Sequence, residues 1–541
     1  MSPADTEPDR EPDREPSSPP ARVHSVGLIG VEGHLVRVEA HLASTIPGFS
    51  LVGLPDAALA ESRDRVRAAI ENSREHWPSR RIVVALSPAT VRKAGSAYDL
   101  AIALAVLTVS KAVPQHAVDG HVFLGELGLD GRLHPVRGIL SSVLAARQAG
   151  FTRVVLPEPN VSEARLVEDI EVLGLRSLRQ AIAVLRNDPV IPDEPAYDDT
   201  RSVEAGPGSD RLAGLDLADV LGQTEARRAL EIAAAGGHHL YLTGPPGAGK
   251  TMLAERLPGL LPDLSRDQAL AVTAIHSLAG ILPPDSPLVT RPPYADPHHT
   301  ASSVSVVGGG SSVIRPGAVS IAHHGILFLD EAPEWKPSVM ETLRQPLESG
   351  QVVVSRASGN VRFPARFQLV MAANPCPCGQ GYGSGLRCTC TPQARRHYQN
   401  RVSGPIRDRI DILLPVEPVS RAEMVADRTL VESTKVVAAR VAEARDRQAW
   451  RYRETRWTLN AHVPGYRLRR EFPPEPGALR VLDSRPTSGW LTARGADRVL
   501  RLAWTIADLN GRDRPGADEV CAALTLRLGH EPRRPRERRA G

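Results

Sequence analysis

The sequence lacks the features that mark secreted and membrane proteins. It has five cysteines, and four of them cluster between positions 376 and 390, which is not the arrangement of a disulfide framework. The longest apolar run, Leu100–Val109, is about half of the roughly 20 residues that a membrane-spanning helix needs. The opening residues are acidic and rich in proline, with no basic start before an apolar stretch, so they do not predict a secretory signal. We therefore expect a cytoplasmic location.

The number of lysines and the net charge are also low. Five of the 66 basic residues are lysines, and the formal net charge is +4. A balance this close to neutral gives no case by itself for a nucleic-acid or membrane partner. The contents of apolar (42%) and charged (24%) residues are those of ordinary globular protein, and 541 residues suffice for two or three domains with separate cores.

Changes in composition divide the chain. The EPDR repeat near the start and the stretch rich in Pro, Asp and Gly before position 213 lack apolar periodicity, so they predict a disordered tail and an interdomain linker. The predicted division is an acidic tail (1–21), a first α/β domain (22–186), a linker (187–212), a second α/β domain with a parallel sheet (213–420), a helical C-terminal domain (421–530) and a basic tail (531–541).

The first predicted domain mixes helices and strands. Residues Arg81–Leu86, Val122–Leu127 and Arg153–Leu156 read as strands. Leu100–Val109 reads as part of a buried helix, and Ile139–Ala149 as a helix that ends at a glycine.

After the linker, strands and helices alternate to about residue 415. The pattern is helical from about residue 420, with long stretches at Ala422–Arg451 and Ala493–Asn510. Cys521 lies in a helical, largely apolar stretch and is expected in the core.

A glycine-rich loop follows the apolar segment Leu240–Thr243 and precedes the helix-forming sequence MLAERL. This strand–loop–helix order is that of a phosphate-binding P-loop, in which backbone N–H groups surround the phosphates at the positive end of a helix. Lys250 would contact the β- and γ-phosphates, and the Thr251 hydroxyl would ligate Mg²⁺, so we expect ATP and Mg²⁺ as cofactors. The predicted loop residues are Gly244, Pro245, Pro246, Gly247, Ala248, Gly249, Lys250 and Thr251.

Polar residues end two further apolar segments. Asp330 and Glu331 follow Gly325–Leu329, and in P-loop ATPases the first acid of such a pair holds Mg²⁺ while the second polarises the attacking water. Asn374 ends Phe367–Ala373, where its amide could bond the γ-phosphate or the water. An Asn-Pro pair also fits a simple turn, but in this order we interpret Asn374 as the first sensor.

Arg409 precedes a further apolar segment. An arginine there could insert into a neighbouring subunit's site and neutralise charge in the transition state. The alternative is an ion pair within the chain, with Asp408 or Asp411.

Together these motifs resemble AAA+ ATPases of the magnesium-chelatase-like group, and most closely the YifB/ComM family. The resemblance extends from residue 22 to about residue 530. It implies a ring, expected to be a homo-hexamer, with Arg409 as the arginine finger. It also places Arg494 as the second sensor on a helical lid, with Arg498 as a competitor for that role. The motifs that carry it are Asp219–Gln223, Pro297–Thr300, Gly308–Gly310, Arg315–Gly317, Ala322–Glu331, Asn374–Gly379 and Ser403–Asp411.

The first predicted domain resembles the proteolytic domain of Lon, through Arg92–Asp99 and Gly125–Gly138. Lon uses a Ser–Lys dyad. The serine position falls on Ala97, with Ser96 one residue early, and the lysine position falls on Leu140. A serine hydroxyl without a base has no local route to activation, so we expect a non-proteolytic domain.

The clustered cysteines form two C-x-C pairs separated by a glycine-rich stretch. The intervening loop is long enough to bring four thiolates together as structural Zn²⁺ prefers, although the spacing is tighter than the usual C-x₂₋₄-C. Two disulfides and four free thiols are the alternatives. The predicted ligands are Cys376, Cys378, Cys388 and Cys390.

Two segments read as inserts that such rings point into the central pore. One runs from about Leu282 to Val319, and the other, Gly350–Arg366, reads as a β-hairpin with Arg356 near its tip. Arginine and backbone amides there suit a DNA backbone without reading its sequence, although a structural hairpin with solvated arginines is the alternative. The histidines at 298–299 and 323–324 are interpreted as loop residues.

The resemblance therefore implies an ATP-driven ring motor that acts on DNA, with branch migration as the specific form. The first alternative is a chelatase motor that drives Mg²⁺ insertion into a tetrapyrrole through partner subunits; the motors of that group are expected to lack the Lon-like domain and the cysteine cluster. The second is a non-proteolytic, chaperone-like remodeller.

Overall fold

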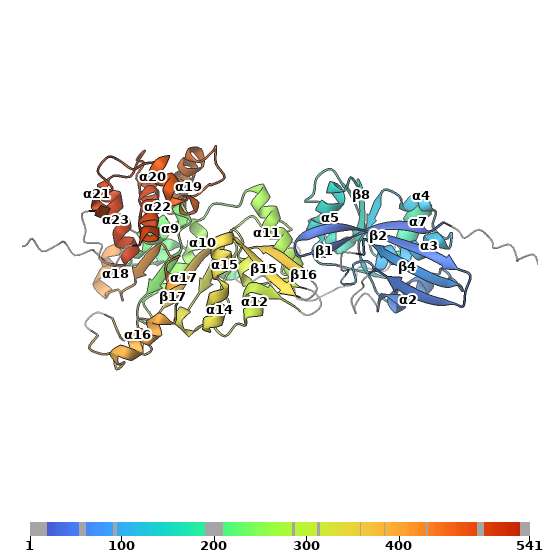
Figure 1. The fold of residues 1–541 in the computed structure, drawn as a ribbon, viewed down its shortest axis with the longest axis horizontal. Coiled ribbons are helices and arrows are strands. Elements are labelled where there is room, and N and C mark those ends of the chain that lie inside the picture. Colours follow the sequence, from blue (N-terminus) through green and yellow to red (C-terminus); the bar gives the residue numbers. More distant parts are fainter. Residues whose placement is uncertain are drawn as a thin grey trace, which may run out of the picture. The chain divides into compact units, whose positions relative to one another are not determined.

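The computed structural model describes residues 19–53, 61–89, 93, 95–189, 209–283, 287–310, 314–356, 359–382, 385–428, 431–483 and 492–530. The predicted terminal tails, apart from residues 19–21, and most of the predicted linker lie outside these ranges. The chain divides into two compact units; the first comprises residues 1–201, and the second residues 202–310 and 314–541 (Figure 1). Within the described ranges, no helix combines the length and apolarity needed to cross a membrane.

A seven-stranded mixed sheet forms the centre of the first unit, in the order β3-β4-β2-β1-β5-β8-β9. The β1–β2 and β2–β4 pairs are antiparallel, and the other neighbours are parallel. The strands are β1 (Ala21–Ile29), β2 (Glu32–Ala43), β3 (Gly48–Val52), β4 (Arg81–Ser87), β5 (His121–Phe123), β8 (Arg153–Pro157) and β9 (Glu171–Leu175).

Helices pack on this sheet. Every residue of α3 (Asp99–Val109) is buried, as its predominantly apolar sequence predicts. Both α3 and α5 (Ile139–Gln148) contact β1 and β2, and α2 (Ser62–Asn72) contacts α3. The remaining short elements are α4 (Gln115–Val118), α6 (Val161–Ala164), α7 (Leu178–Arg186) and the β6–β7 hairpin (Glu126–Leu127 with Leu133–His134).

The sequence predicts β4, α3, α5 and β8 in this unit, but it misreads one strand. Val122–Leu127 is two elements, β5 and β6, because Leu124 and Gly125 between them belong to neither strand. A Cβ atom on Gly125 would lie 2.9 Å from the Leu133 side chain, so this close approach favours glycine. The central β1 and β2 strands are absent from the prediction.

The second unit contains a five-stranded sheet whose neighbours are all parallel, in the order β11-β14-β17-β10-β18. Carboxyl ends of parallel strands meet at one edge, so the segments that follow β10, β14 and β17 lie near one another. The strands are β10 (Leu240–Thr243), β11 (Tyr294–Ala295), β14 (Ile326–Leu329), β17 (Gln368–Ala373) and β18 (Ile412–Pro415).

Helices from both halves of this unit share one core. Residues of α9 (Thr224–Gly236) and α10 (Lys250–Leu260) pack in the same buried cluster as residues of α19 (Thr434–Arg451), α22 (Ala493–Leu509) and α23 (Ala517–Leu528). The C-terminal helices, orange to red in Figure 1, therefore pack directly on α9 and α10 in this unit.

Other elements of this unit are short. The longest is α11 (Arg266–Ala279), which begins at a Ser265–Gln268 capping box. The others are α8 (Ser209–Leu212), α12 (Ser303–Val307), α13 (Ala318–Ile321), α14 (Pro337–Thr342), α15 (Arg344–Ser349), α16 (Pro392–Asn400), α17 (Gly404–Arg407), α18 (Arg421–Asp427), α20 (Gly465–Arg470), α21 (Arg480–Asp483), the β12–β13 pair (Gly308–Gly309 with Arg315–Pro316) and the β15–β16 hairpin (Gln351–Arg356 with Gly359–Pro364).

Three expectations for this unit need correction. The segment from Leu282 to Val319 is not wholly an insert, because it supplies β11, the edge strand of the main sheet. The stretch Ala422–Arg451 is two helices, α18 and α19, since α19 starts after Ser433 as its N-cap. Cys521 is half-buried on α23 rather than in the core.

Candidate nucleotide-binding site

The glycine-rich loop connects β10 directly to α10, as its sequence predicts. Gly249 is the residue before the first turn of α10, and its φ of 89° lies in the left-handed region that favours glycine. A Cβ atom on Gly244 would lie 2.1 Å from the carbonyl oxygen of Val416, which follows β18. The loop thus packs tightly at the carboxyl edge of the sheet, with the N–H groups of α10 open to an anion.

Lys250 is largely buried at the start of α10. Its ammonium donates to the carbonyl oxygens of Gly244 and Pro245, at 2.8 and 2.9 Å, and to Oδ1 of Asn374 at 3.2 Å. Burial lowers the pKa of Lys250, against the opposing charges of Asp330 and Glu331. The structure therefore brings together the predicted lysine, both acids and the predicted sensor asparagine.

The Thr251 hydroxyl donates to Oδ2 of Asp330 across 2.8 Å, so two oxygens suited to Mg²⁺ lie side by side. The other oxygen of Asp330 accepts the backbone N–H of Glu331 at 2.8 Å. The indole of buried Trp335 donates to the Asp330 carbonyl at 3.0 Å, which anchors the end of β14. This pair of oxygens fits a magnesium ion beside the loop.

Glu331 is exposed, and its backbone has a φ of 49°, an uncommon value for a residue with a side chain. Its carboxylate lies 3.2 Å from Nδ1 of His299. Sequence reasoning interpreted His299 as a loop residue and missed this contact. The signal available was its place in the PHHT motif, Pro297–Thr300.

The other histidine pair, His323 and His324, contacts the backbone of Arg366 rather than the glycine-rich loop. Nδ1 of His323 accepts the backbone N–H of Arg366 at 3.0 Å, and the backbone N–H of His324 donates to the Arg366 carbonyl at 2.6 Å. Burial lowers the pKa of His323 to about 3 and that of His324 to about 4, so both are neutral at physiological pH. The pair ties the start of β14 to the end of the β15–β16 hairpin.

Gln223 holds the glycine-rich loop through hydrogen bonds to backbone carbonyls. Its buried amide donates to the carbonyl oxygens of Ala248, at 3.2 Å, and Glu417, at 2.9 Å. It therefore connects the loop to the segment after β18, a role that its place in the Asp219–Gln223 motif did not reveal.

Arg409 lies at the other edge of the sheet. It precedes β18, whose first residue, Ile412, pairs with Leu240 at the start of β10, whereas the glycine-rich loop follows the end of β10. The guanidinium forms an ion pair with Glu348 and donates to the Pro405 carbonyl at 2.6 Å. The ion-pair partner is thus neither Asp408 nor Asp411, but a residue of α15.

Arg494 and Arg498 lie on α22 near this second edge. The exposed Arg494 is close enough for its charge to help lower the pKa of Arg409, after burial and the charge of Arg344. Arg498 donates to Oδ1 of the buried Asp411 at 2.6 Å. Burial opposes ionisation of Asp411, but Arg498 and His238 hold its pKa well below the usual range. Arg498 therefore forms an ion pair with Asp411 within the chain, whereas Arg494 takes no part in that ion pair.

The four clustered cysteines lie together. Their sulfur atoms are all within 4.8 Å of one another, and the pairs among Cys376, Cys378 and Cys388 are 3.4 to 3.5 Å apart. None is in a disulfide. Sulfurs around tetrahedral zinc are about 3.8 Å apart, given Zn–S bonds of about 2.3 Å. Backbone N–H groups of Gln380 and Thr389 lower the pKa of Cys378 to about 5, which favours a thiolate there, whereas burial raises the pKa of Cys376. The set fits zinc.

This cysteine loop contacts the nucleotide loop. A Cβ atom on Gly379, between the first and second cysteine pairs, would lie 2.7 Å from the ring of Pro246. Gly379 has a φ of 76° and so occupies the left-handed region. The cysteine cluster therefore packs against the segment that would surround the phosphates.

Arg356 is the last residue of β15, and it pairs with Gly359 across the hairpin. The predicted hairpin is present, with Arg356 beside its turn, while the position of the Arg356 side chain lies outside the described part of the structure.

The dyad positions of the first unit hold no nucleophile–base pair. The Leu140 side chain is buried, and its backbone N–H donates to Glu163 at 2.7 Å. Ser96 bonds Glu126, and the buried Lys93 ammonium bonds the Pro88 carbonyl. In the described part of this unit, the hydrogen bonds of Lys93 and Ser96 do not join these two residues to each other.

A parallel sheet that presents a glycine-rich loop, a Thr–Asp oxygen pair and an exposed glutamate at one edge defines an AAA+-type P-loop ATPase. Three family models match the chain: magnesium chelatase, subunit ChlI, over residues 216–424; subunit ChlI of Mg-chelatase, over residues 38–160; and magnesium chelatase, subunit ChlI C-terminal, over residues 431–527.

Relatives match nearly the whole chain. A Mycobacterium tuberculosis (strain H37Rv) protein is 50% identical over 94% of this chain and 98% of its own length. The YifB protein of Escherichia coli is 39% identical, over 91% and 94%. The competence protein ComM of Haemophilus influenzae is 37% identical, over 94% and 97%. The chain belongs to the YifB/ComM family of magnesium-chelatase-like proteins.

Proposed function

We propose that the chain hydrolyses ATP at this site. The observation that carries the proposal is the 2.8 Å contact between the Thr251 hydroxyl and Asp330, beside Lys250 and Glu331. Thr251 and Asp330 would hold Mg²⁺, and the ion would supply positive charge that stabilises the transferring phosphoryl group. Glu331 accepts a proton from the attacking water, and Asn374, within reach of Lys250, orients the γ-phosphate.

The active form is a ring, which we propose is a hexamer. Arg409 and Arg494 lie at the sheet edge opposite their own loop, so in a head-to-tail ring they face the ATP of a neighbouring subunit. In that position Arg409 exchanges Glu348 for the γ-phosphate. The ion pair with Glu348 holds the guanidinium ready until the neighbour's nucleotide arrives.

The cargo that we propose is DNA, moved through the pore without sequence preference, with branch migration as the specific form. Similarity to the competence protein ComM over nearly the whole chain supports this choice. The β15–β16 hairpin supports it too, because Arg356 is the last residue of β15, beside the hairpin turn. An arginine at a hairpin end suits phosphates.

A chelatase motor is the second candidate. Matches to magnesium-chelatase subunit models favour it, and one of them covers residues 38–160, so the first unit does not by itself exclude it. A chelatase motor would respond to a porphyrin-binding partner rather than to DNA.

The test is the ATPase rate of the purified protein with single-stranded, duplex and branched DNA. Glu331→Gln should bind ATP and hydrolyse it about 10²–10⁴-fold more slowly. Arg356→Ala should keep its basal rate and lose much of the stimulation by DNA, and stimulation in the wild type should fall steeply with salt. A rate unchanged by every DNA form at low salt contradicts the DNA proposal and leaves the nucleotide site untouched.

A further inference from the structure

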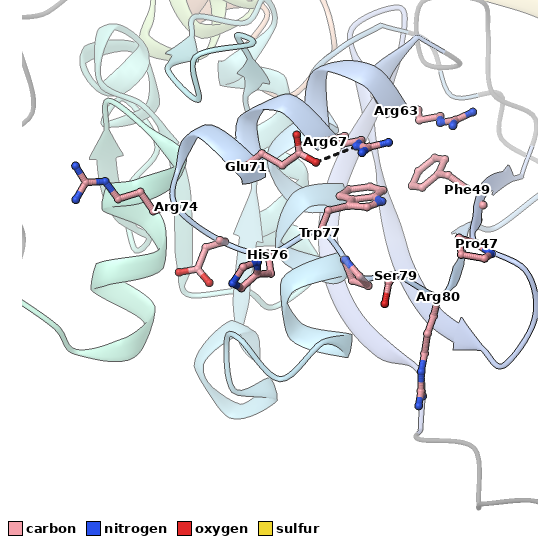
Figure 2. Close-up of a pocket in the computed structure, with 13 residues that line it drawn as sticks. Pro47, Phe49, Arg63, Arg67, Glu71, Arg74, His76, Trp77, Ser79 and Arg80 are labelled. Carbon is pink, nitrogen blue, oxygen red and sulfur yellow. Dashed lines mark hydrogen bonds and ion pairs between the residues drawn. The ribbon is translucent and has the colours of Figure 1, made fainter.

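A pocket lies on the first unit, at the β3 edge of its sheet. It has a volume of about 630 Å³ and is lined by the start of β3, by α2 and by the connection from α2 to β4 (Figure 2). A volume of this size holds a nucleotide-sized group. Neither the dyad positions nor the predicted nucleotide site contributes to it.

Two aromatic side chains form the centre of the pocket. The rings of Phe49 and Trp77 are 5.9 Å apart between centroids and inclined by 37°. Both are half-buried and pack on the core of the unit, which fixes their orientation, while part of each ring faces the pocket (Figure 2). Held rings with exposed faces are a platform on which a planar base can stack.

Arginines predominate among the charged residues that line the pocket. Four line the pocket, against two glutamates. The glutamates are already paired, Glu71 with Arg67 at 3.0 Å and Glu75 with Arg186 at 2.7 Å. Arg74 and Arg80 are exposed and have no ion-pair partner among the described residues. The lining arginines are Arg63, Arg67, Arg74 and Arg80.

The arrangement of the arginines suits a chain of phosphates better than a single one. Figure 2 shows Arg63 and Arg67 beside the aromatic pair, while Arg74 and Arg80 point away from it in different directions. A free nucleotide needs its cations converging on one phosphate group. A polynucleotide backbone passing over a stacked base meets cations on more than one side.

We propose that this pocket binds single-stranded DNA, with a base stacked on Phe49 and Trp77 and flanking phosphates on the arginines. The proposal goes beyond the ring motor, because the pocket is complete within the first unit and requires neither ATP nor Arg356. It gives the chain a second DNA contact that can hold one strand while the motor acts on the substrate.

The main experiment measures binding of a labelled oligothymidylate by the full-length protein without nucleotide. Trp77→Ala should weaken binding about 10-fold, since stacking of one base on an aromatic side chain contributes that order of affinity. Arg63→Glu should weaken it as well, and a glutamate in the first turn of α2 is compatible with the helix dipole, so the fold should persist. Arg153→Ala, an exposed arginine on β8 far across the sheet order, is the matched control and should bind as the wild type.

Intrinsic fluorescence tests direct contact. Oligothymidylate should quench tryptophan emission, and Trp77→Phe should bind nearly as tightly while losing that part of the quenching. An abasic strand of the same length should bind more weakly and quench little. Equal binding of the abasic strand, or quenching by thymidine monophosphate but not by the oligonucleotide, would overturn the proposal.

Failure here is distinguishable from failure of the proposed motor. If Trp77→Ala and Arg63→Glu bind the oligonucleotide like Arg153→Ala, the pocket proposal is wrong even where DNA stimulates the ATPase. If the variants lose binding but no DNA form stimulates the ATPase, the pocket proposal stands and the motor proposal fails.

Discussion

Nδ1 of His299 lies 3.2 Å from a carboxylate oxygen of Glu331, the residue that we propose polarises the attacking water. The two residues come from different segments: His299 precedes α12, and Glu331 follows β14. Glu331 is otherwise exposed, so this contact restricts a side chain that solvent would leave mobile.

His299→Ala should therefore lower the turnover number about 10-fold with little change in ATP affinity, because a positioning contact is lost while the phosphate contacts remain. His299→Asn, which keeps a donor, should recover part of the rate. His298→Ala is the control, since His298 bonds Thr300 instead. Equal rates for all three variants in steady-state assays would show that His299 does not position Glu331.

Arg409→Ala should abolish hydrolysis while ATP binding persists, because the finger serves a neighbour's site. Mixing Arg409→Ala subunits with Glu331→Gln subunits should restore part of the activity, since one partner supplies the finger and the other an intact site. Arg407→Ala, exposed in the same segment, is the control and should stay active. Two inactive variants that remain inactive when mixed and co-assembled would contradict a shared site.

One zinc ion per chain is expected in the purified protein, bound by the four clustered cysteines. Cys388→Ser should lose zinc and also weaken ATP binding, because the loop with Gly379 packs on Pro246. Cys521→Ser, outside the cluster, should retain both. The checks are metal analysis and nucleotide titration; substoichiometric zinc in freshly prepared protein would count against the assignment.

The first unit should cleave neither casein nor fluorogenic peptides. Ala97 supplies no hydroxyl, Leu140 is buried in the core, and Ser96 bonds Glu126 rather than a lysine. Ser96→Ala should leave any background cleavage unchanged. Cleavage that disappears in Ser96→Ala would show an active serine and refute the prediction.

Acid stability should depend on Asp411. Its pKa is depressed in the folded state, so its contribution to the free energy of unfolding is fully present above the unfolded pKa of about 4 and is lost as pH falls through the folded pKa. Arg498→Ala removes the arginine partner of this buried carboxylate, which keeps its contacts with His238 and the His239 backbone N–H, and should cost up to about 3–5 kcal/mol at neutral pH. That loss should shrink as acid protonates Asp411. Urea unfolding across pH, with the exposed Arg494→Ala as control, measures both effects.

Contiguous motifs were predictable from the sequence because local chemistry specifies them. The P-loop needs a strand, glycines, a lysine and a helix in one uninterrupted segment, and the structure has β10, Gly249, Lys250 and α10 in that order. The C-x-C pairs likewise predicted a four-sulfur cluster. The predicted hairpin at Gly350–Arg366 is present as β15 and β16.

Less was predictable where a segment's role depends on distant partners. The sequence 122–127 has a strand-like composition, yet it divides into β5 and β6 around Gly125, whose backbone lies close to the Leu133 side chain. Tyr294–Ala295 is too short to show a periodicity, and it becomes a strand only because β14 offers an edge with free hydrogen-bonding groups.

By itself the sequence determined the chemistry of the nucleotide loop, because the residues that would contact the phosphates are neighbours in the chain. Tertiary structure alone decided that Arg409 pairs with Glu348, that His299 contacts Glu331 and that Phe49 and Trp77 share a pocket with arginines. Each of these relationships joins residues from separate elements. A side chain's charge or shape is readable in sequence, but its partner is chosen by the packing of the sheets and helices that carry both.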